Sequence, residues 1–298
     1  MAQDPTELEQ HRVEAPDGWP LWASEVPPVG DPRAIVIAGH AMMVNGRTLL
    51  HPTRPCLAHT LAAAGLHVLV PDLRGHGRSA RGPMGLRMWR YDDLVDDTAT
   101  WVALACALAP DLPVVTLGHS LFGHTTLAWM ARTPGHPIVR HAMLAANLWT
   151  RQWTDSPVRW LRKRAWIELL TPLASVLGAL PVRRLRIGTD DPSGPYWHAL
   201  ATQVRTGRWC ADDGTDYAAL LPHLDVPVLH VLTDGDPFLA RPADAALFSA
   251  ALPHRELWRI TAADVGGASP PTHMGLATDP RCQDVWRRVA AWLRGPDD

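Results

Sequence analysis

The sequence predicts an α/β protein with a mainly parallel β-sheet flanked by helices and an inserted helical cap. Short runs of valine, isoleucine and leucine alternate with segments whose apolar residues recur at helical spacing, a pattern typical of crossover connections between parallel strands. The alternation stops between residues 147 and 214, where tryptophan and proline are frequent. We therefore expect a core formed by residues 1–146 and 215–298, and a tryptophan-rich cap formed by residues 147–214.

The apolar runs define the expected strands. They are Ala34–Ala38, His67–Val70, Val114–Leu117, Val139–Leu144, Val226–Leu232 and Glu256–Ile260. The segments Asp92–Leu108 and Arg281–Leu293 concentrate their apolar residues on one face, so both are expected to be helices that cover the sheet. Gly295 and Pro296 follow the second segment as stop signals.

Composition and charge exclude several classes of protein. The chain has a formal net charge of −2 and lacks a long run of basic residues, so a nucleic-acid partner is not expected. The segment Met1–Gln10 is polar and acidic rather than a secretory signal, so the expected location is cytoplasmic. Four cysteines lie far apart without a Cys-x-x-Cys pair, which predicts buried or partly buried free thiols and no metal site.

The segment Ala165–Val182 is largely apolar but is not expected to span a membrane. Glu168, Pro172 and Pro181 interrupt it, and it barely reaches the ~20 residues that a spanning helix needs. A buried helix or a lid helix is the better interpretation. Basic residues on both sides allow transient docking on a lipid surface, but no stable membrane association is predicted.

The candidate nucleophile follows the strand Val114–Leu117. That strand runs into Gly118-His119-Ser120-Leu121-Phe122-Gly123 and then into an apolar segment with helical character. A strand, a tight turn and a helix form the setting in which a serine hydroxyl is exposed as a nucleophile. The alternative is that Ser120 only caps the helix. Gly118 allows the close approach of strand and helix, whereas Phe122 stands where a second glycine is usual.

Two other segments make the pattern specific. Ile35-Val36-Ile37-Ala38-Gly39-His40-Ala41-Met42 is similar to a strand with a His-Gly-type loop, and Asp72-Leu73-Arg74-Gly75-His76-Gly77-Arg78-Ser79 matches an Asp-x-Arg-Gly-His-Gly-x-Ser turn. Together with the serine turn, they resemble the α/β-hydrolase superfamily, in particular its esterase, lipase and serine aminopeptidase-like branch. The resemblance implies the α/β-hydrolase fold and gives Arg74 and His76 an architectural role. Ala41 departs from the usual glycine.

The resemblance also implies the remaining catalytic residues. Asp236, in Asp234-Gly235-Asp236-Pro237, follows a late strand where the family carries its acid, with Asp234 as the alternative. His273 precedes the terminal helix, where the family places its base. The chain order Ser120, Asp236, His273 then fits a triad.

The oxyanion hole is assigned by the same resemblance. Its donors are expected to be the backbone N–H groups of Leu121 and Met42, with Ala41 as the alternative to Met42. His119, next to the nucleophile, is expected to pack rather than react.

The sequence indicates the substrate less directly than it indicates the catalytic residues. The cap tryptophans form either an apolar acyl pocket or the core of the cap itself; they are Trp149, Trp153, Trp160, Trp166, Trp197 and Trp209. Carboxylates that could recognise an amine are Asp190, Asp191, Asp212 and Asp213. We expect a serine esterase acting on a small, apolar acyl substrate, without cofactor or metal. The alternatives are a thioesterase, an aminopeptidase, an acyltransferase or a non-catalytic ligand-binding homologue. The sequence does not indicate an oligomeric state.

Overall fold

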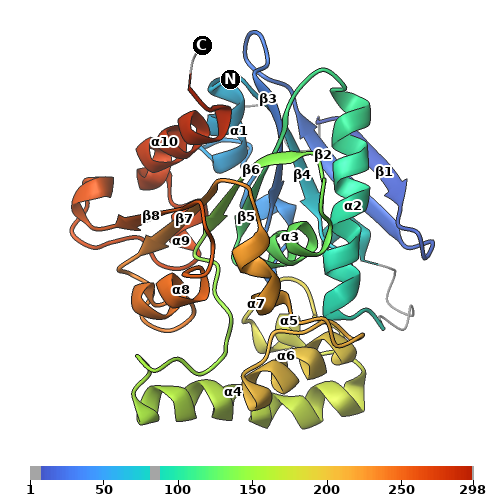
Figure 1. The fold of residues 1–298 in the computed structure, drawn as a ribbon, viewed down its shortest axis with the longest axis vertical. Coiled ribbons are helices and arrows are strands. Elements are labelled where there is room, and N and C mark those ends of the chain that lie inside the picture. Colours follow the sequence, from blue (N-terminus) through green and yellow to red (C-terminus); the bar gives the residue numbers. More distant parts are fainter. Residues whose placement is uncertain (1–7, 81–87, 297–298) are drawn as a thin grey trace.

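A single eight-stranded sheet organises the computed structural model, which describes residues 8–80 and 88–296 (Figure 1). The strand order is β1-β2-β4-β3-β5-β6-β7-β8. The strands are β1 (Gln10–Glu14), β2 (Pro20–Val26), β3 (Ala34–Gly39), β4 (Leu66–Asp72), β5 (Val114–His119), β6 (Ile138–Leu144), β7 (Val228–Thr233) and β8 (Arg255–Ile260).

The sheet is parallel from β4 to β8, which confirms the predicted α/β class. All six predicted strands are present, with ends displaced by one or two residues. Two further strands that were not predicted, β1 and β2, add an antiparallel edge. Most of their residues are only partly buried, so they lack the continuous apolar runs of the central strands. The segment Met1–Gln10 is not expected to be a secretory signal, and its residues 1–7 lie outside the described residues.

Helices cover both faces of the sheet. They are α1 (Leu57–Ala63), α2 (Tyr91–Leu108), α3 (Leu121–Arg132), α4 (Pro157–Leu177), α5 (Val182–Leu185), α6 (Gly194–Thr206), α7 (Tyr217–Leu220), α8 (Pro242–Phe248), α9 (Gly275–Thr278) and α10 (Gln283–Arg294). Side chains of α2 and α3 pack in one buried apolar cluster, whereas those of α1 and α10 pack in a second cluster on the opposite face. Both predicted covering helices are therefore present. All four cysteines are free and at least partly buried, as expected.

Residues 147–214 supply α4, α5 and α6 and contribute no strand to the eight-stranded sheet. These helices gather at one end of the molecule, with α4 along its outer edge (Figure 1). They share a third buried cluster that includes Ile167, Ala174 and Trp197. The division into core and cap remains a prediction. Within residues 8–80 and 88–296, each helix is too short or too polar to cross a bilayer.

Candidate active site

Ser120 lies in a strained turn at the carboxyl end of β5. Its backbone has φ 53° and ψ −106°, a left-handed conformation that is costly for a residue with a side chain. The Ser120 amide donates a hydrogen bond of 2.9 Å to the Leu144 carbonyl at the end of β6. Helix α3 begins at the next residue, Leu121. The turn therefore holds the serine at the edge of the sheet where the parallel strands end, which is where ligands bind in folds of this class.

Two glycines allow α3 to lie this close to the sheet. Gly39 and Gly118 are register partners on the neighbouring strands β3 and β5. A Cβ atom on Gly118 would lie less than 3.0 Å from the backbone of Gly123, and one on Gly39 would lie less than 3.0 Å from three ring atoms of Phe122. The Phe122 ring is 1% exposed and belongs to the core. The glycine usual at position 122 is therefore replaced by a ring that packs over a glycine of the next strand.

His273 and Asp236 are brought together from two loops. His273 Nδ1 lies 2.5 Å from Asp236 Oδ2, and Asp236 is 2% exposed. The same carboxylate accepts hydrogen bonds of 2.8 Å from the amides of Leu239 and Ala240. Burial alone would raise the pKa of Asp236, but the hydrogen bonds from His273 and these amides lower it. Asp236 therefore stays ionised and fixes the imidazole with Nδ1 protonated, leaving Nε2 free to accept a proton.

Asp234, the alternative acid, faces another direction. It is exposed and pairs with Arg259 on β8, and its amide donates to the Ile260 carbonyl at 3.0 Å. The two candidates are two residues apart in one loop, but their side chains have different partners: Asp234 pairs with Arg259, and Asp236 pairs with His273. The geometry brings Asp236 and not Asp234 to His273.

The loop that carries His273 is held by buried polar contacts. His119 Nε2 lies 3.0 Å from the His273 carbonyl oxygen, and the Thr233 hydroxyl donates to the Pro271 carbonyl at 2.5 Å. Burial, together with the nearby His273, lowers the pKa of His119 to about 3, so the ring is neutral and donates through Nε2. His119 is fully buried, which agrees with its expected packing role. Its ring also forms a hydrogen bond with the backbone carbonyl of His273, the expected base.

The loop after β3 carries the other expected oxyanion donor, Met42. His40 orients this loop, since its Nδ1 lies 2.8 Å from the Ala41 carbonyl and its Nε2 accepts from the Leu73 amide at 3.0 Å. Burial, and secondarily the neighbouring His76, lowers the pKa of His40 to about 3, which keeps its ring neutral. Leu121 begins α3, so its amide lacks an acceptor within the helix. Met42 and Leu121 both line the cavity that Ser120 lines.

The predicted architectural residues of the Asp-x-Arg-Gly-His-Gly turn, Arg74 and His76, are buried and do not line the cavity at Ser120. Arg74 is held between two carboxylates, and its Nε donates to Asp97 at 2.9 Å. A second ion pair joins Arg74 to Asp17. His76 is fully buried and its ring lies beside Trp89, with centroids 5.5 Å apart. Both contacts fit an architectural role.

A cavity of about 290 Å³ lies between the sheet edge and the cap helices, and Ser120 and His273 both line it. Its other walls are mainly apolar and include Leu148, Leu200 and Leu239. Five of the six cap tryptophans have one of the two expected roles. Trp149, Trp166 and Trp209 line the cavity, and Trp197 and the partly buried Trp160 pack in the cap cluster. Trp153 is exposed and has neither role.

The four aspartates considered for amine recognition mostly serve other contacts. Asp190 accepts hydrogen bonds of 2.8 Å from the Gly77 amide and from Asn45 Nδ2. Asp191 accepts from the Arg183 amide, and Asp213 accepts from the Thr215 amide. Asp212 alone among them lines the cavity, where it forms an ion pair of 2.9 Å with Arg90. An amine would have to compete with that arginine.

The loop that carries Asp236 is also held from the segment 147–214. Its Leu239 carbonyl accepts hydrogen bonds from Asn147 Nδ2 at 3.2 Å and from Trp149 Nε1 at 3.1 Å. Trp149 meets Phe238 edge to face, with ring centroids 5.6 Å apart. The role of Asn147 was not predicted, because no local pattern links it to Leu239, 92 positions later in the chain.

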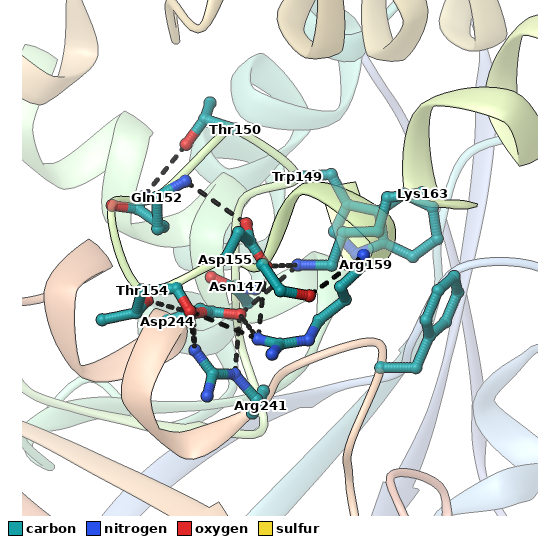
Figure 2. A network of polar contacts seen from close by, with 12 residues as sticks. Asn147, Trp149, Thr150, Gln152, Thr154, Asp155, Arg159, Lys163, Arg241 and Asp244 are labelled. Atoms are coloured by element: carbon teal, nitrogen blue, oxygen red, sulfur yellow. Dashed lines mark hydrogen bonds and ion pairs between the residues drawn. The ribbon is translucent and has the colours of Figure 1, made fainter. Parts of the chain in front are cut away.

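A buried charge cluster joins the start of α4 to α8 (Figure 2). Lys163 Nζ lies 3.5 Å from both Asp155 Oδ1 and Asp244 Oδ2, and none of the three side chains is exposed. Arg241 donates to Asp244 Oδ1 at 2.6 Å and to the Thr154 carbonyl at 2.8 Å. Burial alone would raise the pKa of Asp244, but Arg241, Thr154 and Lys163 lower it to about 2. Opposite charges thus anchor α4 beside the acid loop.

One group of the described residues has the spacing of metal ligands, and it lies elsewhere. The side chains of Glu9, His11 and Glu25 place possible ligand atoms within 4.8 Å of one another on the antiparallel edge of the sheet. His11 Nε2 lies 2.5 Å from one oxygen of Glu25, and His67 Nε2 lies 2.6 Å from the other. None of these residues lines the cavity at Ser120.

Comparison with known proteins places this geometry in context. The profile of the serine aminopeptidase family S33 matches residues 30–260. A monoacylglycerol lipase of Mycolicibacterium smegmatis is 37% identical over 108 residues, which are 36% of this chain and 36% of the lipase. Phospholipase YtpA of Bacillus subtilis is 28% identical over 89 residues, which are 30% of this chain and 33% of the phospholipase. The matched regions thus span about a third of each of these relatives.

Solved structures agree in fold. An esterase from Exiguobacterium antarcticum superposes with a TM-score of 0.62 over 99% of this chain and 100% of the esterase, at 14% sequence identity. A haloalkane dehalogenase from Bradyrhizobium elkani superposes with a TM-score of 0.59 over 97% of this chain and 98% of the dehalogenase, at 18% identity. Since the named activities of these two proteins differ, the likeness establishes the α/β-hydrolase fold and leaves the chemistry to the site.

Proposed function

Because the chain belongs to the serine aminopeptidase family S33, we propose that it is a serine hydrolase that cleaves carboxylic esters of small, apolar acyl groups. One observation carries the proposal: the strained Ser120 and the Asp236-bonded His273 line the same cavity. A nucleophile, a base within a shared pocket and a carboxylate that orients the base are the components of acyl transfer through a covalent intermediate.

In the proposed reaction, His273 takes the hydroxyl proton of Ser120 as the oxygen attacks the ester carbonyl. The buried Asp236 stabilises the imidazolium that forms and holds its orientation. His273 then gives the proton to the departing alcohol, which leaves an acyl group on Ser120. A water molecule activated by the same imidazole attacks this acyl-enzyme, and the acid product and free serine follow.

Negative charge on the substrate oxygen is proposed to be stabilised by the amides of Leu121 and Met42. The contacts that support this are the helix start at Leu121 and the two hydrogen bonds by which His40 holds the neighbouring loop. Losing one donor of this kind typically lowers turnover about 100- to 1000-fold.

A cytoplasmic location also remains a prediction.

The cavity walls support an apolar acyl group. Trp149, Trp166 and Leu200 line the cavity. Two carboxylates also line it, but Asp212 pairs with Arg90, and Asp92 accepts hydrogen bonds from the Tyr217 hydroxyl and the Asp212 amide. An ester with an apolar acyl chain fits the apolar walls, whereas a free α-amine would have to compete with these existing partners of the carboxylates. The contacts therefore favour ester cleavage over removal of an N-terminal amino acid.

Fluorophosphonate labelling tests the nucleophile directly. We expect the probe to attach to Ser120 and the label to be lost in Ser120→Ala, whereas Ser24→Ala on β2 keeps it. With p-nitrophenyl esters of rising chain length, kcat/KM should increase up to about fourfold per added methylene until the cavity is full. Labelling that survives in Ser120→Ala would overturn the assignment. Faster cleavage of aminoacyl amides than of the esters would favour the aminopeptidase alternative.

A further inference from the structure

The outer face of α4 is apolar and open to solvent. The buried positions of this helix recur every three or four residues at Lys163, Ile167, Thr171 and Ala174, which face the protein. The opposite face carries exposed apolar side chains at Val158, Leu161, Leu169 and Val176, with Leu173 at its edge. The helix thus buries one face against the protein and leaves an apolar face exposed to solvent.

This outer face is long and lies at the edge of the molecule. Helix α4 has 21 residues, which at 1.5 Å per residue extend over about 30 Å. Leu169 is 77% exposed and Val176 is 83% exposed. Figure 1 shows α4 along the outer edge, with α6 between it and the sheet. A continuous apolar surface of this kind marks an interaction site, because scattered single residues are what solvated surfaces normally carry.

Basic residues are frequent in and after this helix. Residues 157–187 contain seven basic residues and one acidic residue, and two of the basic ones, Arg159 and Lys163, pair with the buried Asp155 and Asp244. Arg162 and Arg164 of α4 are exposed, as are Arg183, Arg184 and Arg186 in and after α5. The acidic residue, Glu168, accepts a hydrogen bond of 2.8 Å from Arg205 and is neutralised by it. The region is therefore cationic as well as apolar.

We propose that the outer face of α4 docks the protein on bilayers that contain anionic phospholipid, with the helix parallel to the membrane plane. Its apolar side chains enter the boundary between headgroups and acyl chains, and the arginines pair with anionic headgroups. A second copy of the chain is a poorer occupant, because a symmetric contact would place two cationic faces together. The docking is reversible, since no covalent or membrane-spanning anchor is part of it.

An exposed apolar side chain that follows α5 also borders the cavity. Ile187 is 48% exposed and also lines the cavity that contains Ser120. The exposed Leu185 lies two residues before it, in α5. We expect an acyl chain that leaves the bilayer to pass Ile187 on its way to Ser120. This consequence rests on the proposed ester hydrolysis, whereas the docking itself does not.

Vesicle co-sedimentation tests the docking. We expect the full chain to sediment with vesicles of phosphatidylcholine and phosphatidylserine, and much less with vesicles of phosphatidylcholine alone. Salt should weaken the binding because it screens the arginines. The Ser120→Ala variant should sediment equally well, which separates this test from the test of the proposed function. The dependence of binding on vesicle composition and on salt is measured with the original α4 surface. These results therefore do not depend on whether a surface variant folds.

Substitutions on α4 locate the contact. The double variant Leu169→Asp, Val176→Asp should lower the vesicle partition coefficient on the order of 100-fold, because two side chains lose their burial. Arg162→Gln, on α4 itself, should lower it about fivefold. Val29→Asp is the matched control: Val29 is 68% exposed but lies between β2 and β3, and its variant should bind like the original chain. None of these residues lines the cavity, so cleavage of a water-soluble ester should be unchanged.

Three results would overturn the proposal. The first is the absence of sedimentation with anionic vesicles. The second is binding that the α4 substitutions leave intact or that Val29→Asp reduces equally. The third is a dimer in analytical ultracentrifugation that Leu169→Asp converts to a monomer, because the face would then belong to a second copy of the chain.

Discussion

The contact between Phe122 and Gly39 offers a direct test of how the serine turn is built. In Phe122→Ala the ring that covers Gly39 is lost, and a void forms between α3 and β3. In Gly39→Ala the new methyl group would lie less than 3.0 Å from three atoms of that ring, so the ring or the strand must shift. In the double variant, the methyl group occupies part of the space that the ring has left.

The magnitudes follow from these contacts. Phe122 is 1% exposed, and removing a buried phenylalanine side chain costs about 3–5 kcal/mol. At about 2 °C per kcal/mol for a chain of this size, Phe122→Ala should lower the Tm by roughly 6–10 °C. Gly39→Ala overpacks the same site at about 1–3 kcal/mol. The double variant should be less destabilised than the sum of the two by about 1–3 kcal/mol.

Urea unfolding of the four proteins at one pH measures this coupling, and fluorophosphonate labelling reports whether Ser120 remains reactive. We expect every folded variant to be labelled, because Phe122 does not line the cavity. Additive free energies of unfolding would refute the reasoning, since they would mean that the ring and the new methyl group do not compete for space. A changed acyl-chain preference in Phe122→Ala would place the ring in the substrate pocket instead.

Three further predictions concern the buried charges. Asp236→Asn should lower kcat on the order of 10⁴-fold because the imidazole loses its orienting carboxylate, whereas Asp234→Asn should be mild; the opposite ranking in steady-state kinetics would transfer the role. Lys163→Met should lower the free energy of unfolding by about 3 kcal/mol, because it leaves buried carboxylates without that cation; an unchanged urea midpoint would contradict this. The pKa of Asp244 is about 2 in the folded state against an ordinary value of 3.8, so its stabilising contribution is present above about pH 4 and lost as the pH falls toward 2. Between about pH 5 and pH 2 the original chain should therefore lose about 2 kcal/mol more stability than Asp244→Asn in urea unfolding.

Local patterns in the sequence determined the fold class and the candidate residues. The runs of β-branched and aliphatic residues predicted the five strands β3 to β7, because a strand buried on both faces needs continuous apolar side chains. The sixth predicted strand, β8, forms the other edge of the sheet and is largely exposed. The turn around Ser120 and the Asp-x-Arg-Gly-His-Gly segment were predicted for a similar reason. Each depends on residues within a few positions of one another, where backbone conformation restricts the choice of side chain.

Other features were decided only by contacts between distant segments. Asp234 and Asp236 have nearly the same local sequence environment, and only the packing of the His273 loop against β7 selects Asp236. The Phe122 ring has room because Gly39 lies on a neighbouring strand, 83 positions earlier in the chain. The contact of Lys163 with Asp244 joins residues 81 positions apart. The sequence determined which groups this protein carries, but their directions and partners depend on side-chain packing, which is set by the tertiary structure as a whole.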